Sequence, residues 1–307
     1  MALDRIQKAL LKQIADIESI PAGAYNLRIN GKSTQRNSTA NIEIIGKEDK
    51  SGIDIYIKPG TKNERVEIPV LITDTGITEK VYNDFHVGAD SDVVIVAGCG
   101  IHNCGNSDSE HDGIHSFFLD RGARVKYIER HYGEGDGDGK RLLNPETRIF
   151  IDEDGYMEME TSQIKGVDST YRKTYATLED RATLIIHEKI MTHGNQTATT
   201  DFTVDLDGVD SGAHVVSRSV ARDDSHQLFI SCVDGNNRSN GHTECDAIIM
   251  DNASVSAVPK VTANHPEASL IHEAAIGKIA GEQLTKLMTL GLTEKEAEEE
   301  IIAGFLC

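Results

Sequence analysis

The residues best suited to chemistry lie in the last quarter of the chain. Cys245 stands within the segment Gly241–Asn252, and His272 is followed directly by Glu273. No Lys or Arg adjoins these residues, and the sequence around them has the apolar character of strands. Thiolate, imidazole and carboxylate groups are ligands that iron and zinc accept. The two segments therefore predict a metal site, against the simpler interpretation that Cys245 is a small buried side chain.

A second group of possible ligands stands near residue 100. Two cysteines and three histidines lie within residues 99–115, namely Cys99, His102, Cys104, His111 and His115. This composition is typical of a metal or sulfur-handling site, but its spacing differs from the Cys-x2-Cys pattern of a zinc knuckle. Ordinary loop residues are the alternative interpretation.

Three further features are interpreted as structural. The run Gly133–Gly139 alternates glycine with acidic residues, lacks the register of a phosphate-binding loop, and is predicted to be a solvated turn. His187 and His214, which belong to strand-like segments, are predicted to be half-buried polar residues with local hydrogen bonds. Cys232 is predicted to be a core residue.

Charge and composition disfavour several classes of function. The 307 residues include 50 acidic and 31 basic side chains, which gives a formal net charge of −19. That charge repels nucleic acids and anionic membranes. No apolar run approaches the roughly 20 residues of a membrane span, and the N-terminus lacks the pattern of an export signal. With an odd number of cysteines, five, we expect a cytoplasmic protein with reduced thiols and no nucleic-acid or membrane partner.

The elements that must position these residues are mostly short strands. Apolar residues at helical spacing predict one helix within residues 3–20. From about residue 41 the pattern changes to short runs of period two, separated by Gly, Asp, Asn and Lys. Such a rhythm without intervening helices fits a sandwich, a barrel or a β-solenoid, and the pattern alone does not choose among them.

The chain ends with two predicted helices. The apolar stripe Leu284–Met288 ends at Gly291, and Thr293 with Glu296 has the signature of a capping box for the last helix. This pair presents more apolar surface than its two helices can bury between themselves. The simpler interpretation is that the pair packs across the open end of the strand region, and the functional interpretation adds docking to a partner.

The C-terminal region resembles the SufB/SufD family, the scaffold subunits of the SUF iron–sulfur cluster assembly system. The likeness covers about the last two hundred residues. Its motifs are Cys245-Asp246, His272-Glu273-Ala274, Lys278-Ile279, Glu282-Gln283-Leu284, Gly291–Ala297 and Gly304-Phe305. For a compact member, the resemblance implies a mainly β fold, a right-handed parallel β-helix (β-solenoid). Residues 1–40 would form an N-terminal helical segment, residues 41–270 the β-helix core, and residues 271–307 a C-terminal helical segment.

The resemblance also implies a function for the first group of residues. The chain would be a scaffold rather than an enzyme, holding iron and a transient iron–sulfur cluster at the interface of two subunits, expected here to be identical. Cys245 would bind the cluster, and His272 and Glu273 would approach it from the other subunit. Because neighbouring strand residues point to opposite faces, we expect Glu273 to be a ligand and His272 either a ligand or an orienting neighbour.

Two partners follow from the same resemblance. A SufC-type ABC ATPase would bind the C-terminal helices and hydrolyse ATP, and a cysteine desulfurase system would supply sulfur to Cys99 or Cys104. An alternative function is a β-solenoid enzyme that cleaves acidic polysaccharides with carboxylates and a metal. The negative charge of the chain disfavours this alternative, because it repels an anionic substrate.

Overall fold

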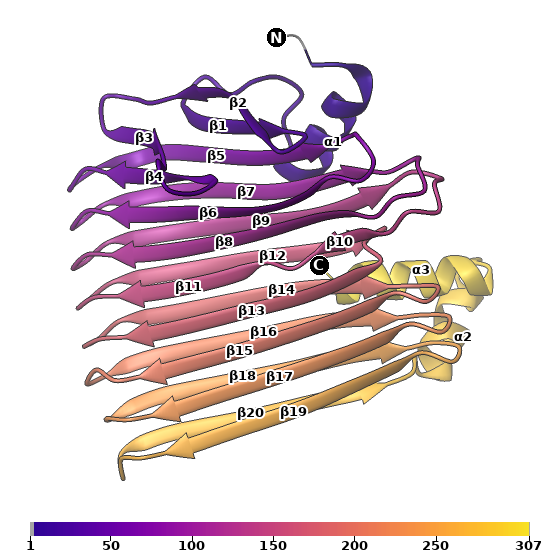
Figure 1. Ribbon diagram of the computed structural model, residues 1–307. Coiled ribbons are helices and arrows are strands. Elements are labelled where there is room, and N and C mark those ends of the chain that lie inside the picture. Colours follow the sequence, from indigo (N-terminus) through magenta and orange to yellow (C-terminus); the bar gives the residue numbers. More distant parts are fainter. Residues whose placement is uncertain (1–2, 307) are drawn as a thin grey trace.

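The strands of the computed structural model wind into a β-solenoid of about eight coils (Figure 1), which confirms the predicted architecture. The structure describes residues 3–306. Each coil contributes one strand to each of two sheets, called here the first and the second sheet. In spatial order, the first sheet contains β2 (Lys32–Asn37), β1 (Ala24–Ile29), β5 (Lys62–Ile72), β7 (Asp92–His102), β9 (Arg124–Glu134), β12 (Tyr156–Lys165), β14 (Thr183–Thr192), β16 (Ser211–Ala221), β18 (Ser239–Ile249) and β20 (Ala268–Gly277). The second sheet contains β3 (Ile42–Gly46), β4 (Gly52–Ile57), β6 (Thr78–Val87), β8 (Ser109–Leu119), β10 (Arg141–Leu143) with β11 (Glu146–Ile151), β13 (Ser169–Leu178), β15 (Thr197–Leu206), β17 (His226–Gly235) and β19 (Ser254–Ala263).

Period-two patterning places one side of each strand inside the solenoid. In β14 every second residue is buried. Residues one coil apart pair in register, so that Met159, Ile186 and Val215 form a fully buried column. Apolar columns of this kind make up the main core, to which each coil adds a few residues. Short polar residues with left-handed backbone turn the corners, as at Asp154 and Asp210.

The N-terminal helix covers the outer face of the first sheet at one end of the solenoid. α1 (Arg5–Ala15) begins at a capping box formed by Asp4 and Gln7. Its buried residues Leu10 and Ile14 pack over β5, β7 and β9. Gly98 of β7 permits this close approach, because a Cβ atom there would lie 2.8 Å from the Ile14 Cβ. The helix predicted within residues 3–20 is confirmed.

The segment 1–40, which was expected to be helical, also contains a β-hairpin. Strands β1 and β2 pair antiparallel, and β1 continues the first sheet beside β5. Both turn residues, Asn30 and Gly31, have positive φ angles of 48° and 78°, as a type I′ hairpin turn requires. The Asn-Gly pair signals this turn, but the polar strand Lys32–Asn37 lacks the apolar alternation from which the other strands were predicted.

The C-terminal helices pack on the flank of the solenoid and leave its last coil open (Figure 1). β20 runs to Gly277, into the segment expected to be helical, and is followed by α2 (Gly281–Thr289) and α3 (Glu294–Phe305). The predicted capping box of α3 is present. Ile302 of α3 is buried in a cluster with Val220 and Ile248 from the ends of two strands. The expected packing of the helix pair across the open end is therefore wrong. Among residues 3–306, no helix combines the length and apolar content needed to cross a membrane.

The close contact between α1 and β7 predicts an asymmetric response to two glycine substitutions. Gly98→Ala places a methyl group against Ile14, so we expect the free energy of unfolding to fall by about 1–3 kcal/mol. Gly212→Ala in β16 is the matched control, because the nearest atom to its new Cβ is 3.8 Å away. Denaturant unfolding of both variants measures the difference. Equal stabilities would contradict the packing described for α1.

Candidate metal centre

Strand β18 sends the candidate ligands to two opposite faces of the first sheet. Cys245 points into the solenoid and is buried, whereas Glu244 points outward. In β20, His272 pairs in register with the inward residue Thr243, and Glu273 pairs with Glu244. Within one chain the structure therefore places Cys245 and His272 on the inner face and Glu273 on the outer face.

Three donor side chains converge on the outer face at the last two coils. Ligand atoms of His242, Glu244 and Glu273 all lie within 4.8 Å of one another. His242 Nε2 is 3.7 Å from Glu273 Oε2, and this buried nitrogen has no hydrogen-bond partner among the residues that the structure describes. One imidazole and two carboxylates form a donor set that suits a divalent first-row metal such as Fe²⁺. We call these three residues the outer donor group.

The electrostatics of the outer donor group make metal binding compete with protons. A hydrogen bond with Asp246, together with burial, raises the pKa of Glu244. Burial and the neighbouring imidazoles of His242 and His187 lower the pKa of His214. The His214 ring packs edge-on against His242, with ring centroids 4.8 Å apart. A carboxylate must be deprotonated to bind metal, so the raised pKa of Glu244 means that metal and protons compete at this side chain.

An open groove of about 580 Å³ runs along the outer face of the first sheet and reaches the outer donor group. Its lining comes from five neighbouring strands and includes Arg130, Glu160, His187, His214, Arg218 and Glu244. His187 and His214, predicted to be half-buried polar residues, thus line a groove beside possible ligands. This groove gives solvent and ions a route to the donor group.

The inner residues lie in a different environment. Burial, with the nearby carboxylates of Glu188 and Asp246, raises the pKa of Cys245 to about 12. The thiol is therefore protonated at neutral pH in this conformation. His272 Nδ1 lies 2.7 Å from Thr243 Oγ1, and its buried Nε2 has no hydrogen-bond partner within residues 3–306.

Buried charges continue along the interior from Cys245 toward the middle of the solenoid. Ser217, the register partner of Cys245, donates a 2.7 Å hydrogen bond to Glu188. Arg172 forms ion pairs with Glu188 and Glu129. Burial opposes ionisation of Glu129, but Arg172 and neighbouring histidines outweigh it and lower its pKa to about 2. The charges are tolerated inside the protein because they are paired.

The second predicted group divides between the interior and the surface. Cys99, His111 and His115 line one small internal cavity, although their ligand atoms do not converge as those of the outer donor group do. Burial, with Glu79 and Glu129, raises the pKa of the Cys99 thiol. Cys104 instead lies exposed on the loop after β7. Cys232, predicted to be core, is half-buried on the outer side of β17.

Sequence reasoning missed His242 and Glu244. The signal that could have found them is the coil repeat, because His242 stands beside His214 and Glu244 beside Glu273 in register. Finding those pairs requires the number of residues in each coil. The polar corners determine this number, and their sequences vary from coil to coil. The strand rhythm alone therefore does not place these residues together.

Comparisons with known proteins show the family to which the chain belongs. Residues 76–305 match the family model described as SUF system FeS cluster assembly, SufBD core domain. The chain is 29% identical over 266 residues to an iron-sulfur cluster assembly SufBD family protein of Methanothermobacter thermautotrophicus, covering 84% of this chain and 63% of the relative. SufBD family proteins of Methanocaldococcus jannaschii (28% identical; 86% of this chain and 84% of the relative) and Pyrococcus horikoshii (27%; 88% and 82%) are also similar.

The matched region contains both helices α2 and α3, the outer donor group and every strand from β6 to β20. The aligned stretch nevertheless spans less than two thirds of the Methanothermobacter protein. The resemblance seen in the C-terminal motifs is confirmed, and the chain belongs to the SufBD family of iron–sulfur cluster assembly proteins.

Proposed function

We propose that this chain is a scaffold on which iron–sulfur clusters are assembled as cargo, working as a homodimer with an ABC-type ATPase. The observation that carries the proposal is the position of the outer donor group. Its residues lie on β18 and β20, in the last two coils of the first sheet and within the matched SufBD core. Ligands at the open end of a scaffold are accessible to a second subunit. Family membership favours this function over the polysaccharide-active alternative.

The proposed assembly divides two tasks between the faces of β18. The outer donor group takes up Fe²⁺ from the groove, using ligands that bind iron without a thiolate. Cys245 supplies the thiol on the inner face, where its pKa of about 12 keeps it protonated until a metal or sulfur group displaces the proton. Because the two faces are separated by the sheet, a second subunit is needed to bring its own ligands to Cys245.

The open last coil supports the proposed dimer. β19 and β20 are the terminal strands of the two sheets, and within residues 3–306 no strand pairs with their outer edges. Apolar side chains remain exposed there, with Val258 at 53%, Val261 at 45% and Ile271 at 52%. Unpaired strand edges with apolar residues are templates for pairing. Two copies joined by these edges would extend both sheets and bring the inner columns that contain His272 and Cys245 toward each other.

The C-terminal helices support the proposed ATPase contact. Met288 and Leu290 are 44% and 76% exposed although they are apolar. A hollow of about 670 Å³ is lined by Met250, Ile279 and Leu284, the last of which belongs to the same helix as Met288. An exposed apolar surface next to a hollow is typical of a protein contact. Movement of a bound ATPase would act on β20 directly, since α2 follows this strand after three residues.

The outer donor group predicts where iron binds. In the double variant His242→Ala/Glu273→Gln we expect Fe²⁺ affinity to fall by at least about tenfold. In the wild type, affinity should rise with pH, because Glu244, whose pKa is raised, must lose its proton to bind. Anaerobic equilibrium dialysis measures both effects. The control His226→Ala/Glu267→Gln changes the same residue types at exposed positions; equal iron content in the two double variants would remove the outer donor group from the proposal.

The inner thiol predicts a separate effect on cluster formation. Cys245→Ser should abolish cluster accumulation during anaerobic reconstitution while leaving Fe²⁺ affinity at the outer donor group unchanged. Cys232→Ser is the control, because Cys232 lies on the other sheet and faces outward. Iron, sulfide and melting temperature are measured on the same samples. If Cys245→Ser lowers only the melting temperature and cluster yield per folded protein is preserved, Cys245 is a packing residue.

The open end predicts a specific way to keep subunits apart. Val261 stands beside the buried Val233 in register, so its side chain is half-exposed in one chain and would be buried between two. Val261→Lys should give a folded monomer, because an inward-pointing charge blocks edge pairing. Sedimentation analysis compares it with Tyr175→Lys, which replaces an equally exposed side chain on β13. A Val261→Lys protein that remains dimeric would place the interface elsewhere.

A further inference from the structure

The helices leave the middle of the outer face of the first sheet uncovered. α1 packs over β5, β7 and β9 at one end, and Ile302 of α3 packs against the ends of β16 and β18 (Figure 1). The groove of about 580 Å³ lies on the same face and is lined by residues of β9, β12, β14, β16 and β18. Ile128 and Val216 give its lining an apolar part. A small molecule can therefore reach this part of the sheet.

Three half-buried cations follow one line along the groove. Ser162 of β12 pairs in register with Arg130 on one side and with Lys189 on the other, and Lys189 pairs with Arg218. All four residues line the groove. Neighbouring strands lie about 4.8 Å apart, so Lys189 and Arg218 can act together on one small ligand. We call Arg130, Lys189 and Arg218 the cation row.

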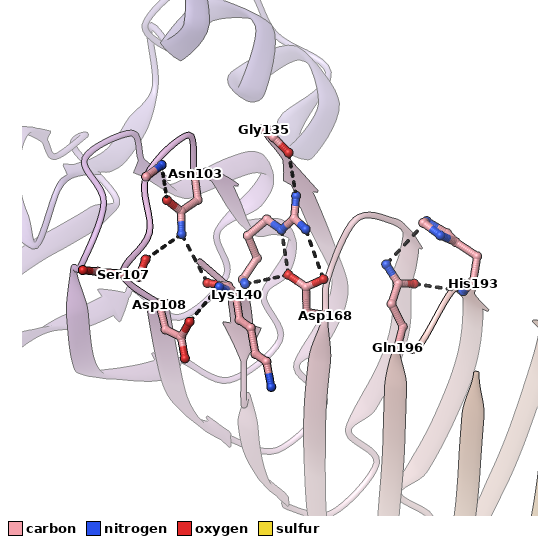
Figure 2. Close-up of polar contacts among 10 residues, drawn as sticks. Asn103, Ser107, Asp108, Gly135, Lys140, Asp168, His193 and Gln196 are labelled. Atoms are coloured by element: carbon pink, nitrogen blue, oxygen red, sulfur yellow. Dashed lines mark hydrogen bonds and ion pairs between the residues drawn. The ribbon is translucent and has the colours of Figure 1, made fainter. Parts of the chain in front are cut away.

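The cation row has no partner within the described chain. Among residues 3–306, its side chains form no ion pair or hydrogen bond, and the Nε atom of Arg218 is buried without an acceptor. Figure 2 shows the opposite case at a corner of the solenoid, where the guanidinium group of Arg141 donates to Asp168 and to the Gly135 backbone oxygen. A buried N–H group without an acceptor is costly. The cation row is therefore suited to an acceptor from outside the chain.

The charge of the groove is opposite to that of the whole chain. The chain has a formal net charge of −19, but the groove contains the cation row, and its Glu160 already accepts a 2.7 Å hydrogen bond from Lys126. A groove lined by cations attracts anions and repels free Fe²⁺. Iron that approaches the outer donor group along this groove is therefore favoured when it is part of an anion.

The arrangement of the cation row favours carboxylates over phosphate. Phosphate groups are typically held where backbone N–H groups converge, at a helix N-terminus or a glycine-rich loop. This groove is instead lined by strand residues, whose backbone N–H groups bond to the neighbouring strands. Cations spaced along a line match separate carboxylates on a short carbon chain, and a guanidinium group binds a carboxylate through two parallel hydrogen bonds.

We propose that the groove binds a small polycarboxylate that chelates Fe²⁺, and that Lys189 and Arg218 hold its carboxylates; its role as iron carrier rests on the proposed function. Arg218 lies on β16, which pairs directly with the strand that carries His242 and Glu244. The carrier is thus held one strand away from two of the ligands that receive the metal. Arg130, farther along the row, attracts the carrier at longer range.

The transfer of iron exchanges coordination bonds only. Bonds from Fe²⁺ to the carboxylate oxygens of the carrier break as bonds to His242, Glu244 and Glu273 form. Iron stays ferrous, so the step needs no oxidant or reductant, and a proton displaced from a ligand passes to solvent. Lys189 and Arg218 compete with the metal for the oxygens of the carrier, which favours release of Fe²⁺ to the outer donor group. The metal-free carrier then dissociates.

Binding of the carrier is tested with citrate alone, without metal, by isothermal titration calorimetry. In Lys189→Gln/Arg218→Gln we expect the citrate affinity to fall by at least about tenfold, because charge-assisted hydrogen bonds are lost. Lys189→Gln alone should show part of this loss. The control Arg148→Gln/Lys173→Gln removes the same charges from neighbouring strands on the outer face of the second sheet, and it should bind citrate as the wild type does.

Three outcomes of the titrations overturn the proposal. The first is a wild type that does not bind citrate. The second is an equal loss of affinity in the control variant, which would show that only net charge matters. The third is tighter binding of pyrophosphate than of citrate under the same conditions, which would make the groove a phosphate site.

Iron delivery is tested separately, by anaerobic rapid filtration. Fe²⁺ supplied as its citrate complex should load the wild type at least about tenfold faster than Lys189→Gln/Arg218→Gln, whereas hydrated Fe²⁺ should load the variant no more slowly than the wild type. Equal slowing with both iron sources would overturn the carrier role. Metal-free citrate should still bind His242→Ala/Glu273→Gln, so failure of the scaffold function and failure of the polycarboxylate site are distinguishable.

Discussion

The coil-to-coil register of the two sheets decides where every functional side chain lies. Each strand residue pairs in register with a residue one coil earlier and one coil later, so possible ligands line up in columns. His214 stands beside His242, and Glu244 beside Glu273. A shift of the register by one residue would move all the side chains on one face of a strand to the opposite face of the sheet. Buried columns such as Met159, Ile186 and Val215 prevent that slip and thereby hold the outer donor group together.

The same constraint brings charges into the interior. Arg172 lies between Glu129 and Glu188, all of them nearly inaccessible to water. Pairing reduces the cost of burying these charges but does not make them a source of stability, since apolar replacements of buried ion pairs are often neutral or stabilising. The apolar columns therefore provide the stability. The buried charged residues occupy part of the core that apolar side chains would otherwise stabilise. The buried carboxylates also affect the inner cysteines. Together with burial, they raise the pKa of the Cys99 and Cys245 thiols, which are therefore protonated at neutral pH.

Period-two runs together with the family motifs predicted the solenoid. Apolar residues at helical spacing predicted its N-terminal helix, and the Thr293 and Glu296 signature predicted the capping box of α3. The hairpin β1–β2 was not predicted, because its polar second strand carries no apolar alternation. The candidate residues Cys245, His272 and Glu273 were found from their types and motifs. Their division between two faces follows from strand geometry, but their neighbours His242 and Glu244 depend on coil lengths that spacing alone does not give. The close packing of the run Gly133–Gly139 was missed for a related reason. Its glycines contact the backbone of a loop one coil away, where a Cβ atom would not fit.

The two ends of the solenoid are built differently, and this limits how copies can associate. At the N-terminal end the sheets finish in antiparallel hairpins, with the largely exposed, polar strand β2 at one edge and β3 at the other. The polar strand β2 resists pairing at its edge. The C-terminal end exposes the edges of β19 and β20 with their apolar residues, while α2 and α3 lie on the flank. If two copies pair through their C-terminal ends as proposed, both use the same surface, and such a contact closes at two subunits instead of extending into a fibre. The open end beside the outer donor group is therefore compatible with a dimer of defined size.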